Sequence, residues 1–495
     1  MTEEIREKQE NKEKKEKKNT QGGQWLAIAL TCVYAAIQIF MLFSHEMWRD
    51  EAYVWVLAKN GSIKEILSML PVVGHPCLWF AYLLPFARLG LPFECLGILS
   101  VVPMIAAVYI FMSDKEVSWP VKIVCLGSSV FLFYNAVVAR PYCLSVLMIV
   151  LLMRFWKNRR EHTIRYCIAA VLLSWTHVIF AGFCGGLLLE LWFSKDNKEE
   201  KNRGVIPSSI ILVLGLMLMV LQVWQFDPSA SSRPVDMQSL AEYTSADHLT
   251  EGVLSIFYYN STAVKFVLMG LTLATLFYFT RSAIVDRRAA RYRSCIPGIC
   301  GVGWFVLIVL FIRPVEHVQM AACLIMIIFF MLYTILAELR YLKKAQNIIA
   351  SVLLVVFAAS TIRFTLTDAL RDIKEPFSGS MEAAEYMIRE LPEGAMLGLE
   401  EKQESEAPYA YMADKRQDVE YFNAWKKERY TYYRWLKCAR PSEEEICTAL
   451  KAVAGAGGAY YLSTREQEMG DMAELVFKSS TDTIWHEEYY LYKIK

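Results

Sequence analysis

Residues Trp25–Phe43 read WLAIALTCVYAAIQIFMLF, an apolar run without a single charged side chain. A hydrocarbon core about 30 Å thick needs about 20 apolar helical residues to cross it. Blocks of roughly this length recur along the chain and are separated by short charged patches. Long apolar runs without alternation indicate helices, because only closed hydrogen-bonded elements survive in lipid. The sequence therefore predicts a mostly α-helical, polytopic membrane protein.

The composition of the chain points the same way. Of its 495 residues 55% are hydrophobic, and its mean hydropathy is positive, which is too apolar for an ordinary soluble multidomain protein. The net charge is only +1, so electrostatics gives no reason to expect a nucleic-acid partner. Most of the cysteines lie in apolar segments, and their spacing resembles no metal site. Cys438 and Cys447 could pair if their part of the chain faces an oxidising compartment.

The charge and hydropathy pattern divides the chain into three parts. Residues 1–22 form a Lys- and Glu-rich tail, which predicts a disordered cytoplasmic segment. Residues 23–362 form a transmembrane module, and its first span is expected to be a retained signal anchor because no small-residue cleavage site follows it. Residues 363–495 are polar and predict a small extracytoplasmic α/β domain.

Local patterns within 363–495 predict single elements of that domain. Met381–Leu391 has helical spacing, and Ser442 with Glu445 forms a capping-box pattern before an apolar run. Gly458–Leu462 and Tyr489–Tyr492 are typical of strands.

About eleven transmembrane helices are expected in the membrane module. Their approximate ranges are 24–44, 95–112, 122–138, 142–156, 165–176, 178–193, 205–225, 264–280, 296–312, 318–338 and 346–362. With a cytoplasmic N-terminus, the inside segments carry 26 Lys and Arg residues and the outside loops carry 8. This asymmetry follows the positive-inside rule and predicts a multi-pass protein of the cell membrane with its C-terminal domain outside.

The first external segment, 45–94, is expected to contain helices that lie along the membrane surface. Ser62–Leu70 begins with a capping-box pair, Ser62 and Glu65. Its apolar residues recur on one face, which is typical of an interfacial helix: Ile63, Ile66, Leu67 and Leu70. His75–Leu89 is apolar but interrupted by two prolines, which favours a second surface helix or a re-entrant helix.

Ionisable side chains gather at one end of the predicted spans. Such groups cost roughly 2.5–3.5 kcal/mol each at membrane depth, so they are functional candidates by default. The groups expected at the outer ends are Asp50, Glu51, His75, Arg140, His177, Arg313 and His317. Several spans that each contribute one polar group to the same leaflet indicate a cavity at the outer interface.

Asp50 and Glu51 follow Trp48 and Arg49 just after the first span. A carboxylate in this place could act as general base on an acceptor hydroxyl. The alternative is a solvated acidic pair at a helix end. No other acidic pair in the sequence lies at an outer membrane boundary, which favours the functional interpretation.

The other candidates also have structural alternatives. His75 could face a ligand, or mark the turn into an interfacial helix. Arg140 could bind a phosphate through bidentate hydrogen bonds, or extend toward water from a helix end. His177 is a ligand-binding residue or a structural histidine. The charged turn Arg313–His317 either pairs internally or faces an anionic head group. The sequence contains no Walker loop, GxGxxG, HExxH or GxSxG motif, so soluble-nucleotide and protease chemistries lack their usual support.

The order of these features over about residues 24–340 resembles the bacterial members of glycosyltransferase family 39, the protein O-mannosyltransferase-like branch of the GT-C superfamily. The matching elements are Asp50-Glu51, His75-Pro76-Cys77-Leu78, Ala139-Arg140-Pro141-Tyr142, Thr176-His177 and, more loosely, Arg313 to His317. Directly before Arg140, where some relatives have an aspartate, the chain has no clear acidic counterpart. This departure from the family pattern leaves open whether a second carboxylate or a metal ion takes part.

The resemblance implies an inverting hexosyl- or pentosyltransferase that takes a sugar from a polyprenyl-phosphate-linked donor. The extracytoplasmic acceptor would be a protein, a lipid or a polymer. No cofactor beyond the lipid-linked co-substrate is implied, and the requirement for a divalent metal ion is left open. Asp50 would be the general base with Glu51 in support. The substrate-binding residues would be Arg49, His75, Arg140, Tyr142, His177, Arg313 and His317.

Two other classes of function compete with this hypothesis. A transporter or flippase for lipid-linked glycans would be expected to carry mid-membrane charges or broken helices in matched halves, and the sequence shows neither. A membrane scaffold or sensor that signals through its outer domain would make Asp50 dispensable.

Overall fold

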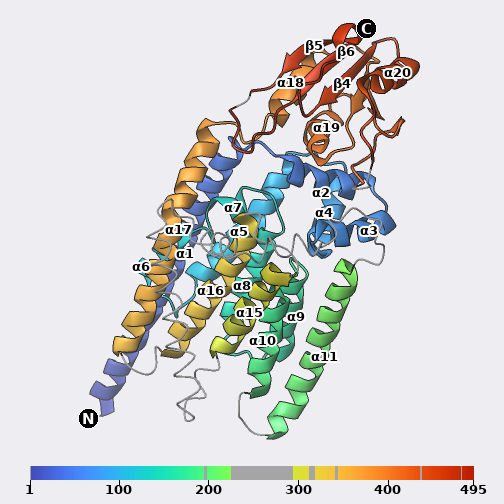
Figure 1. Ribbon diagram of the computed structural model, residues 1–495. Coiled ribbons are helices and arrows are strands. Elements are labelled where there is room, and N and C mark those ends of the chain that lie inside the picture. The colour runs from blue at the N-terminus through green and yellow to red at the C-terminus, as the bar shows by residue number, and fades with distance from the viewer. Residues whose placement is uncertain are drawn as a thin grey trace.

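The computed structural model describes residues 2–193, 198–224, 294–311, 318–339, 344–434, 438–480 and 482–495. Within these residues the protein is mostly helical and carries a sheet domain at its C-terminal end, as the sequence predicts. Figure 1 shows long helices running side by side, with the sheet domain beyond one end of the bundle. Three shorter helices lie between the bundle and this domain (Figure 1).

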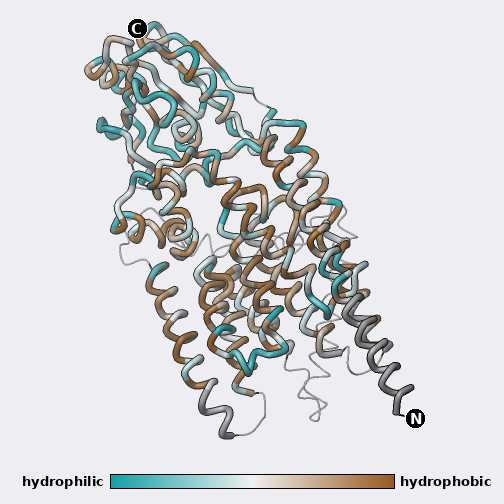
Figure 2. Tube along the Cα trace, turned by 180° about the vertical axis from the view of Figure 1, so that it is seen from behind, coloured by the Kyte–Doolittle hydropathy of each residue, from teal (hydrophilic) through white to brown (hydrophobic). Residues whose placement is uncertain are grey.

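The described helices of the bundle are α1 (Thr2–Leu42), α5 (Cys95–Met112), α6 (Trp119–Leu126), α7 (Phe133–Ala136), α8 (Tyr142–Phe155), α9 (Thr163–Ser174), α10 (Phe180–Phe193), α11 (Lys198–Val223), α15 (Ile296–Phe311), α16 (Val318–Leu339) and α17 (Lys344–Lys374). Among the described residues, the helical stretches long and apolar enough to cross a membrane are Gln21–Leu42, Cys95–Met112, Gly204–Val223 and Ser351–Lys374. Helices α8, α9 and α10 are shorter but also apolar. Figure 2 shows hydrophobic residues along the bundle and hydrophilic ones concentrated in the sheet domain. Phe40 and Leu221 are each more than half exposed on the bundle surface, as lipid-facing side chains are.

One predicted span, 122–138, is wrong as a continuous helix. Helix α6 stops at Leu126, and a buried irregular stretch separates it from the single turn of α7. Polar side chains satisfy the backbone there. Ser128 Oγ donates to the Cys125 carbonyl at 2.6 Å, and the Asn135 amide donates to the Ser129 carbonyl at 2.9 Å. Irregular backbone is tolerated inside a bundle when protein groups take up its hydrogen bonds.

Two other predicted spans need comment. The span expected at 264–280 lies outside the described residues. Helix α17 continues to Lys374, past the predicted end at 362. Its last turns carry Asp368, which accepts a hydrogen bond from Tyr134 Oη at 2.6 Å, and Asp372. Packing partners for these polar residues let the helix continue beyond the apolar run.

The segment between α1 and α5 forms α2 (Arg49–Asn60), α3 (Ile63–Val73) and α4 (Leu78–Arg88). The predicted capping box at α3 is confirmed, because Glu65 N donates to Ser62 Oγ at 3.2 Å and Ser62 N donates to Glu65 Oε2 at 2.7 Å. The apolar face of α3 is divided. Ile66 and Leu70 are buried against the protein, whereas Ile63 and Leu67 are each 50% exposed.

The sheet domain contains α18 (Ser380–Glu390), β1 (Met396–Leu399), η2 (Gln403–Ser405), α19 (Glu406–Met412), β2 (Glu420–Asn423), β3 (Glu428–Arg429), α20 (Glu443–Val453), β4 (Ala459–Ser463), η3 (Gly470–Met472), β5 (Ala473–Lys478) and β6 (Tyr490–Ile494). The strand order is β3-β2-β1-β4-β6-β5. Strand β1 is parallel to β2 and β4, and the other neighbours are antiparallel. The carboxyl ends of β1, β2 and β4 therefore meet at one edge of the sheet.

The elements predicted in this domain are confirmed. Helix α18 and strands β4 and β6 coincide with the predicted ranges within one or two residues. The Ser442 capping box starts α20, since Glu445 N donates to Ser442 Oγ at 3.2 Å. Cys438 and Cys447 are both free thiols.

Direct contacts join the sheet domain to the segment after α1. Met47 N donates to Tyr411 Oη at 2.8 Å, and Ser380 Oγ donates to the Met47 carbonyl at 2.9 Å. At the rim of the same junction, Lys415 Nζ lies 2.6 Å from Glu94 Oε1. The domain is therefore seated over the start of α2, where the acidic pair lies.

Candidate functional site

The acidic pair begins helix α2 instead of ending the helix before it. Acidic side chains are favoured in a first helical turn, where the helix dipole is positive. Glu51 Oε2 accepts a hydrogen bond from Trp48 N at 3.1 Å, which satisfies a backbone donor at the start of α2. Glu51 is fully buried and Asp50 is partly buried, so the pair is not a solvated helix end.

Glu51 is occupied by contacts that hold the surrounding segments together. Its Oε1 accepts from Ala139 N at 2.5 Å, and its Oε2 lies 3.2 Å from His45 Nε2. The other ring nitrogen of His45 lies 3.1 Å from Asp372 Oδ1 at the end of α17. Burial alone would lower the pKa of His45, but the carboxylates of Asp372 and Glu51 outweigh it and raise this pKa to about 10. A histidinium thus links the loop after α1 to α2 and α17.

Asp50 faces in a different direction and meets side chains from two distant segments. Arg140, in the turn before α8, forms an ion pair with Asp50 Oδ2. Gln403, in η2 of the sheet domain, donates from Nε2 to Asp50 Oδ1 at 2.8 Å. The Nε atom of Arg49 is 3.9 Å from the same Oδ1 atom. Asp50 therefore lies between the bundle and the sheet domain and is bonded to both.

Three aromatic side chains extend this cluster beyond Arg140. Arg140 Nη2 lies 3.2 Å from His75 Nε2, in the loop between α3 and α4. The His75 ring packs edge-on against His177, between α9 and α10, with a centroid distance of 4.8 Å. Tyr142, the first residue of α8, stacks on His177 at 6.0 Å. His75, Arg140, Tyr142 and His177 are all buried.

The tautomers of the two histidines follow from their partners. Because Arg140 can only donate, His75 Nε2 must accept and its proton resides on Nδ1 when the ring is neutral. His177 Nδ1 accepts from Ile179 N at 3.2 Å, so a neutral His177 carries its proton on Nε2.

Arg49 connects the cluster to acidic residues of the sheet domain. Its Nη1 atom lies 2.5 Å from Glu404 Oε1, and its Nε atom lies 3.4 Å from Glu487 Oε1. Burial raises the pKa of Glu487 to about 7, and Glu404 and Asp50 push it the same way, while Ser378 and Arg49 oppose the shift. Glu487 is therefore shared between its charged and neutral forms near neutral pH.

The structure thus brings together six of the residues that the sequence singles out: Arg49, Asp50, His75, Arg140, Tyr142 and His177. Glu51 adjoins them but is engaged elsewhere. Arg313 and His317 lie outside the described residues. Sequence reasoning missed Gln403, Glu404 and Glu487. No local pattern marks them, since they reach the site only through the docking of the sheet domain.

Metal chemistry has no preformed centre in the part of the chain that the structure describes, where no group of three or more His, Cys, Asp and Glu side chains is placed to hold an ion. The polar atoms of the cluster suit a different ligand. Arg140 Nε is buried without a hydrogen-bond partner among the described residues. A buried guanidinium with unused donors is suited to an anion such as a phosphate.

Comparison with known proteins adds no relative. No protein-family model matches the chain, and no curated protein sequence matches it.

Proposed function

We propose that this protein is a membrane glycosyltransferase that moves a sugar from a polyprenyl-phosphate-linked donor to an extracytoplasmic acceptor. The observation that supports this function best is the cluster of Asp50, Arg140 and His75. These residues come from three separate segments and meet at one end of an apolar bundle, under a polar domain. A lipid-linked donor needs that boundary, because its chain is apolar and its phosphate is charged.

In this proposal Arg140 binds the donor phosphate. A guanidinium has five N–H donors in a planar fork, which match two phosphate oxygens at once. Asp50 and His75 occupy part of that fork, while Nε is unpartnered within the described part of the chain. An arriving phosphate can use the open side and then replace the carboxylate of Asp50. Electrostatic stabilisation of the departing phosphate is the kind of contribution that usually dominates such catalysis.

Asp50 is the general base in the same step. Once Arg140 turns to the phosphate, Asp50 Oδ2 has a lone pair free for the acceptor hydroxyl. The hydroxyl oxygen attacks the anomeric carbon, and the bond from that carbon to the phosphate oxygen breaks with its electron pair. The hydroxyl proton passes to Asp50, the lipid phosphate leaves as the anion, and the anomeric configuration inverts. The base is thus released only when the donor is in place.

The proposal includes a topology. We place the chain in the cell membrane with about eleven spans, a cytoplasmic N-terminus and an extracytoplasmic sheet domain. The positions of charges support this orientation. The basic segment after α8 contains Lys157 and Arg159, and it lies at the opposite end of α8 from Tyr142 and the cluster. Basic residues are enriched on the cytoplasmic side of membrane proteins.

The decisive experiment replaces Asp50 with asparagine in the full-length protein. Membrane vesicles that contain the variant are supplied with a panel of radiolabelled undecaprenyl-phosphate-linked hexoses and pentoses, and label transferred to envelope material is measured. Asp50→Asn should abolish transfer at unchanged protein level. The matched control is Asp414→Asn, which removes a carboxylate paired with Lys59 at the rim of the same junction and should transfer normally.

Transfer by Asp50→Asn at a near-normal rate would sink the general-base assignment. A flippase would instead move labelled donor between leaflets without forming any product, so the same vesicles separate the two functions. Mass analysis of envelope glycans after deletion of the protein would then identify the sugar and the acceptor.

A further inference from the structure

The sheet domain contributes directly to the polar cluster through the segment after strand β1. Gln403 donates to Asp50 Oδ1 at 2.8 Å, and Glu404 Oε1 lies 2.5 Å from Arg49 Nη1. Both residues belong to η2, between β1 and α19. A hydrogen bond to the proposed base is functionally relevant only if the segment that provides it is held firmly.

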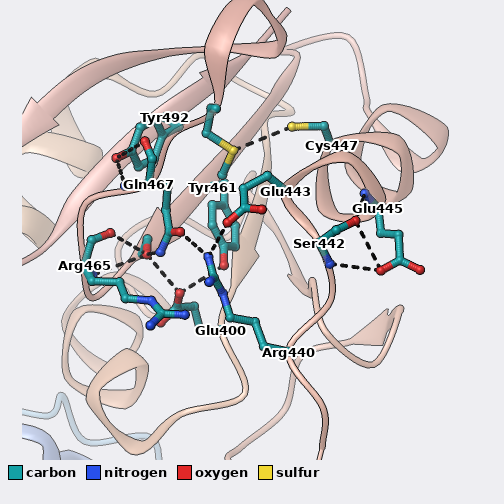
Figure 3. A network of polar contacts seen from close by, with 12 residues as sticks. Glu400, Arg440, Ser442, Glu443, Glu445, Cys447, Tyr461, Arg465, Gln467 and Tyr492 are labelled. Atoms are coloured by element: carbon teal, nitrogen blue, oxygen red, sulfur yellow. Dashed lines mark hydrogen bonds and ion pairs between the residues drawn. The ribbon is translucent and has the colours of Figure 1, made fainter.

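The beginning of this segment is anchored to strand β4. Glu400 is fully buried directly after β1, and its carboxylate accepts hydrogen bonds from Tyr461 Oη at 3.0 Å and Ser463 Oγ at 2.9 Å. Figure 3 shows Glu400 beside Tyr461, within a wider network in which Arg440 bonds to Gln467. A buried carboxylate that lost these donors would carry a large desolvation cost, so Glu400 stays in place.

The rest of the segment is anchored on the other side of β1. Glu401 is buried and accepts a hydrogen bond from Asn423, the last residue of β2, and Lys426 Nζ lies 2.6 Å from its Oε1 atom. Glu406 is fully buried and accepts from Tyr430 Oη at 3.0 Å. Three buried carboxyl groups, those of Glu400, Glu401 and Glu406, therefore fix both flanks of Gln403 at the carboxyl edge of the parallel strands.

We propose that Gln403 is a positioning residue that holds the Asp50 carboxylate in its reactive orientation after Arg140 has turned to the donor phosphate. This inference rests on the proposed function of Asp50. A carboxylate has about four lone-pair positions, and Gln403 uses one on Oδ1. The Oδ2 atom then remains for the acceptor hydroxyl. The amide is suited to this role, because it is uncharged and does not compete with Arg140 as a second cation would.

With Gln403 in this role, the site needs residues from both the helical bundle and the sheet domain. Without the sheet domain, Asp50 would lose the hydrogen bond from the uncharged amide of Gln403. Positioning errors of about 1 Å at a reacting group can cost roughly 100-fold in rate. We therefore expect the bond from Gln403 to affect the chemical step more than donor binding.

Two variants of Gln403 test this role in the full-length protein. Gln403→Leu keeps the bulk of the side chain and removes the donor, and it should lower kcat about 100-fold with the apparent donor KM nearly unchanged. Gln403→Glu replaces the amide by a carboxyl group of the same shape. At neutral pH it should be similarly impaired, because two adjacent carboxylates repel each other.

The pH profile separates positioning from general structural damage. Below neutral pH the new carboxyl group becomes protonated and can donate to Asp50 as the amide does. Gln403→Glu should therefore recover relative to wild type between pH 8 and pH 5, whereas Gln403→Leu should not. The charged and titratable groups that face this contact are Arg140, Arg49, Glu404, Glu487 and His75. All of them are common to the wild type and both variants.

The matched control is Lys415→Gln, which removes an exposed ion pair with Glu94 across the same junction. It should leave kcat, KM and the pH profile unchanged. Wild-type kcat in Gln403→Leu, or a ratio of Gln403→Glu to wild type that stays flat from pH 8 to pH 5, would overturn the positioning role.

A measurement without substrate keeps this inference distinct from the proposed function. The apparent melting temperature of detergent-solubilised Gln403→Glu should lie below that of the wild type at pH 8 and approach it at pH 5. Equal melting temperatures at both pH values would overturn the contact itself. Retained transfer by Asp50→Asn would overturn the proposed function, whatever the melting curves show.

Discussion

Replacement of His45 by glutamine provides a stringent test of the link between the bundle and the sheet domain. His45 is buried, with Glu51 Oε2 at 3.2 Å from one ring nitrogen and Asp372 Oδ1 at 3.1 Å from the other. Glutamine fits the space but carries no charge, so two buried carboxylates lose the cation between them. Removing one partner of a buried ionic cluster typically costs about 3–5 kcal/mol.

The pKa of His45 gives a second measure of the same effect. Its value in the folded protein is about 10, raised by Asp372 and Glu51 against the opposing effect of burial from an ordinary value of 6.5. At pH 7 the folded-state pKa still lies about three units above the pH. At 1.36 kcal/mol per unit, this protonation stabilises the folded state by about 4 kcal/mol. Because the folded-state pKa is raised, the stabilisation is fully present below pH 6.5 and is lost as the pH rises through about 10.

The assay follows intrinsic fluorescence of the full-length protein in detergent during heating, at a series of pH values from 6 to 10. Trp48 stacks on Trp485 at 4.5 Å within the same junction, so two of the thirteen tryptophans contribute a signal from this region. His45→Gln should melt several degrees below the wild type at pH 7, and the gap should narrow toward pH 10. His162→Gln, at an exposed position, is the control and should match the wild type.

If His45→Gln lowers the free energy of unfolding at pH 7 by less than about 1 kcal/mol relative to the wild type, the reasoning is refuted, since exposed ion pairs already reach that value. A gap that stays constant from pH 7 to pH 10 would also refute it. Adding Asp372→Asn to His45→Gln removes one of the two uncompensated charges. The double variant should therefore recover part of the lost stability, as expected for directly interacting residues.

Two further predictions concern the site and its supporting loop. Arg140→Ala should raise the apparent KM for an undecaprenyl-phosphate-linked sugar far more than it alters acceptor preference, because the guanidinium is the proposed phosphate ligand. An unchanged donor KM in vesicle transfer assays would count against that role. Burial raises the pKa of Glu406 to about 8, so the folded state should lose stability as the pH rises from about 4.5 to 8. Glu406→Gln removes this titration while its carbonyl still accepts from Tyr430, and thermal melting should show the variant more stable than the wild type at pH 9 and similar at pH 5. A wild-type-like pH dependence in the variant would show that Glu406 is charged throughout.

The parts of the fold that follow from local patterns were predictable. Apolar length located α1, α5 and α11, and hydrogen-bonding side chains at helix starts located α3 and α20. The break after α6 escaped detection because Ser128 and Ser129 lie within a run whose average is apolar. Their effect depends on partners such as Thr361 in α17, whose hydroxyl accepts from Ser129 N at 3.1 Å. The sequence pattern of one segment does not reveal which residues of another segment will form its hydrogen bonds.

The residues of the candidate site likewise fall into those that the sequence could group and those that it could not. Asp50, His75, Arg140 and His177 could be grouped from the sequence, because each predicted span fixes the end of the bundle at which its flanking loop lies. Their contacts required only that the helices pack side by side. Gln403 and Glu404 follow β1 in an ordinary polar stretch, and Glu487 precedes β6. Their place beside Asp50 and Arg49 depends on how a separate domain docks, which has no local signature in the sequence.

The partnership of Asp50 and Arg140 explains why a site of this kind needs a second domain. With no donor bound, the ion pair keeps the carboxylate satisfied and the guanidinium neutralised at a boundary where unpaired charge is costly. In the proposed reaction that pair must separate, and each charge then needs a replacement. The donor phosphate takes the place of Asp50 as the partner of Arg140. For Asp50 the replacement comes from Gln403 and the acceptor hydroxyl. The segment that carries Gln403 is fixed by the side chains of Glu400 and Glu406, which are buried within the sheet domain. A membrane module alone would leave the proposed base without the hydrogen bond from Gln403 at the moment when it has to act.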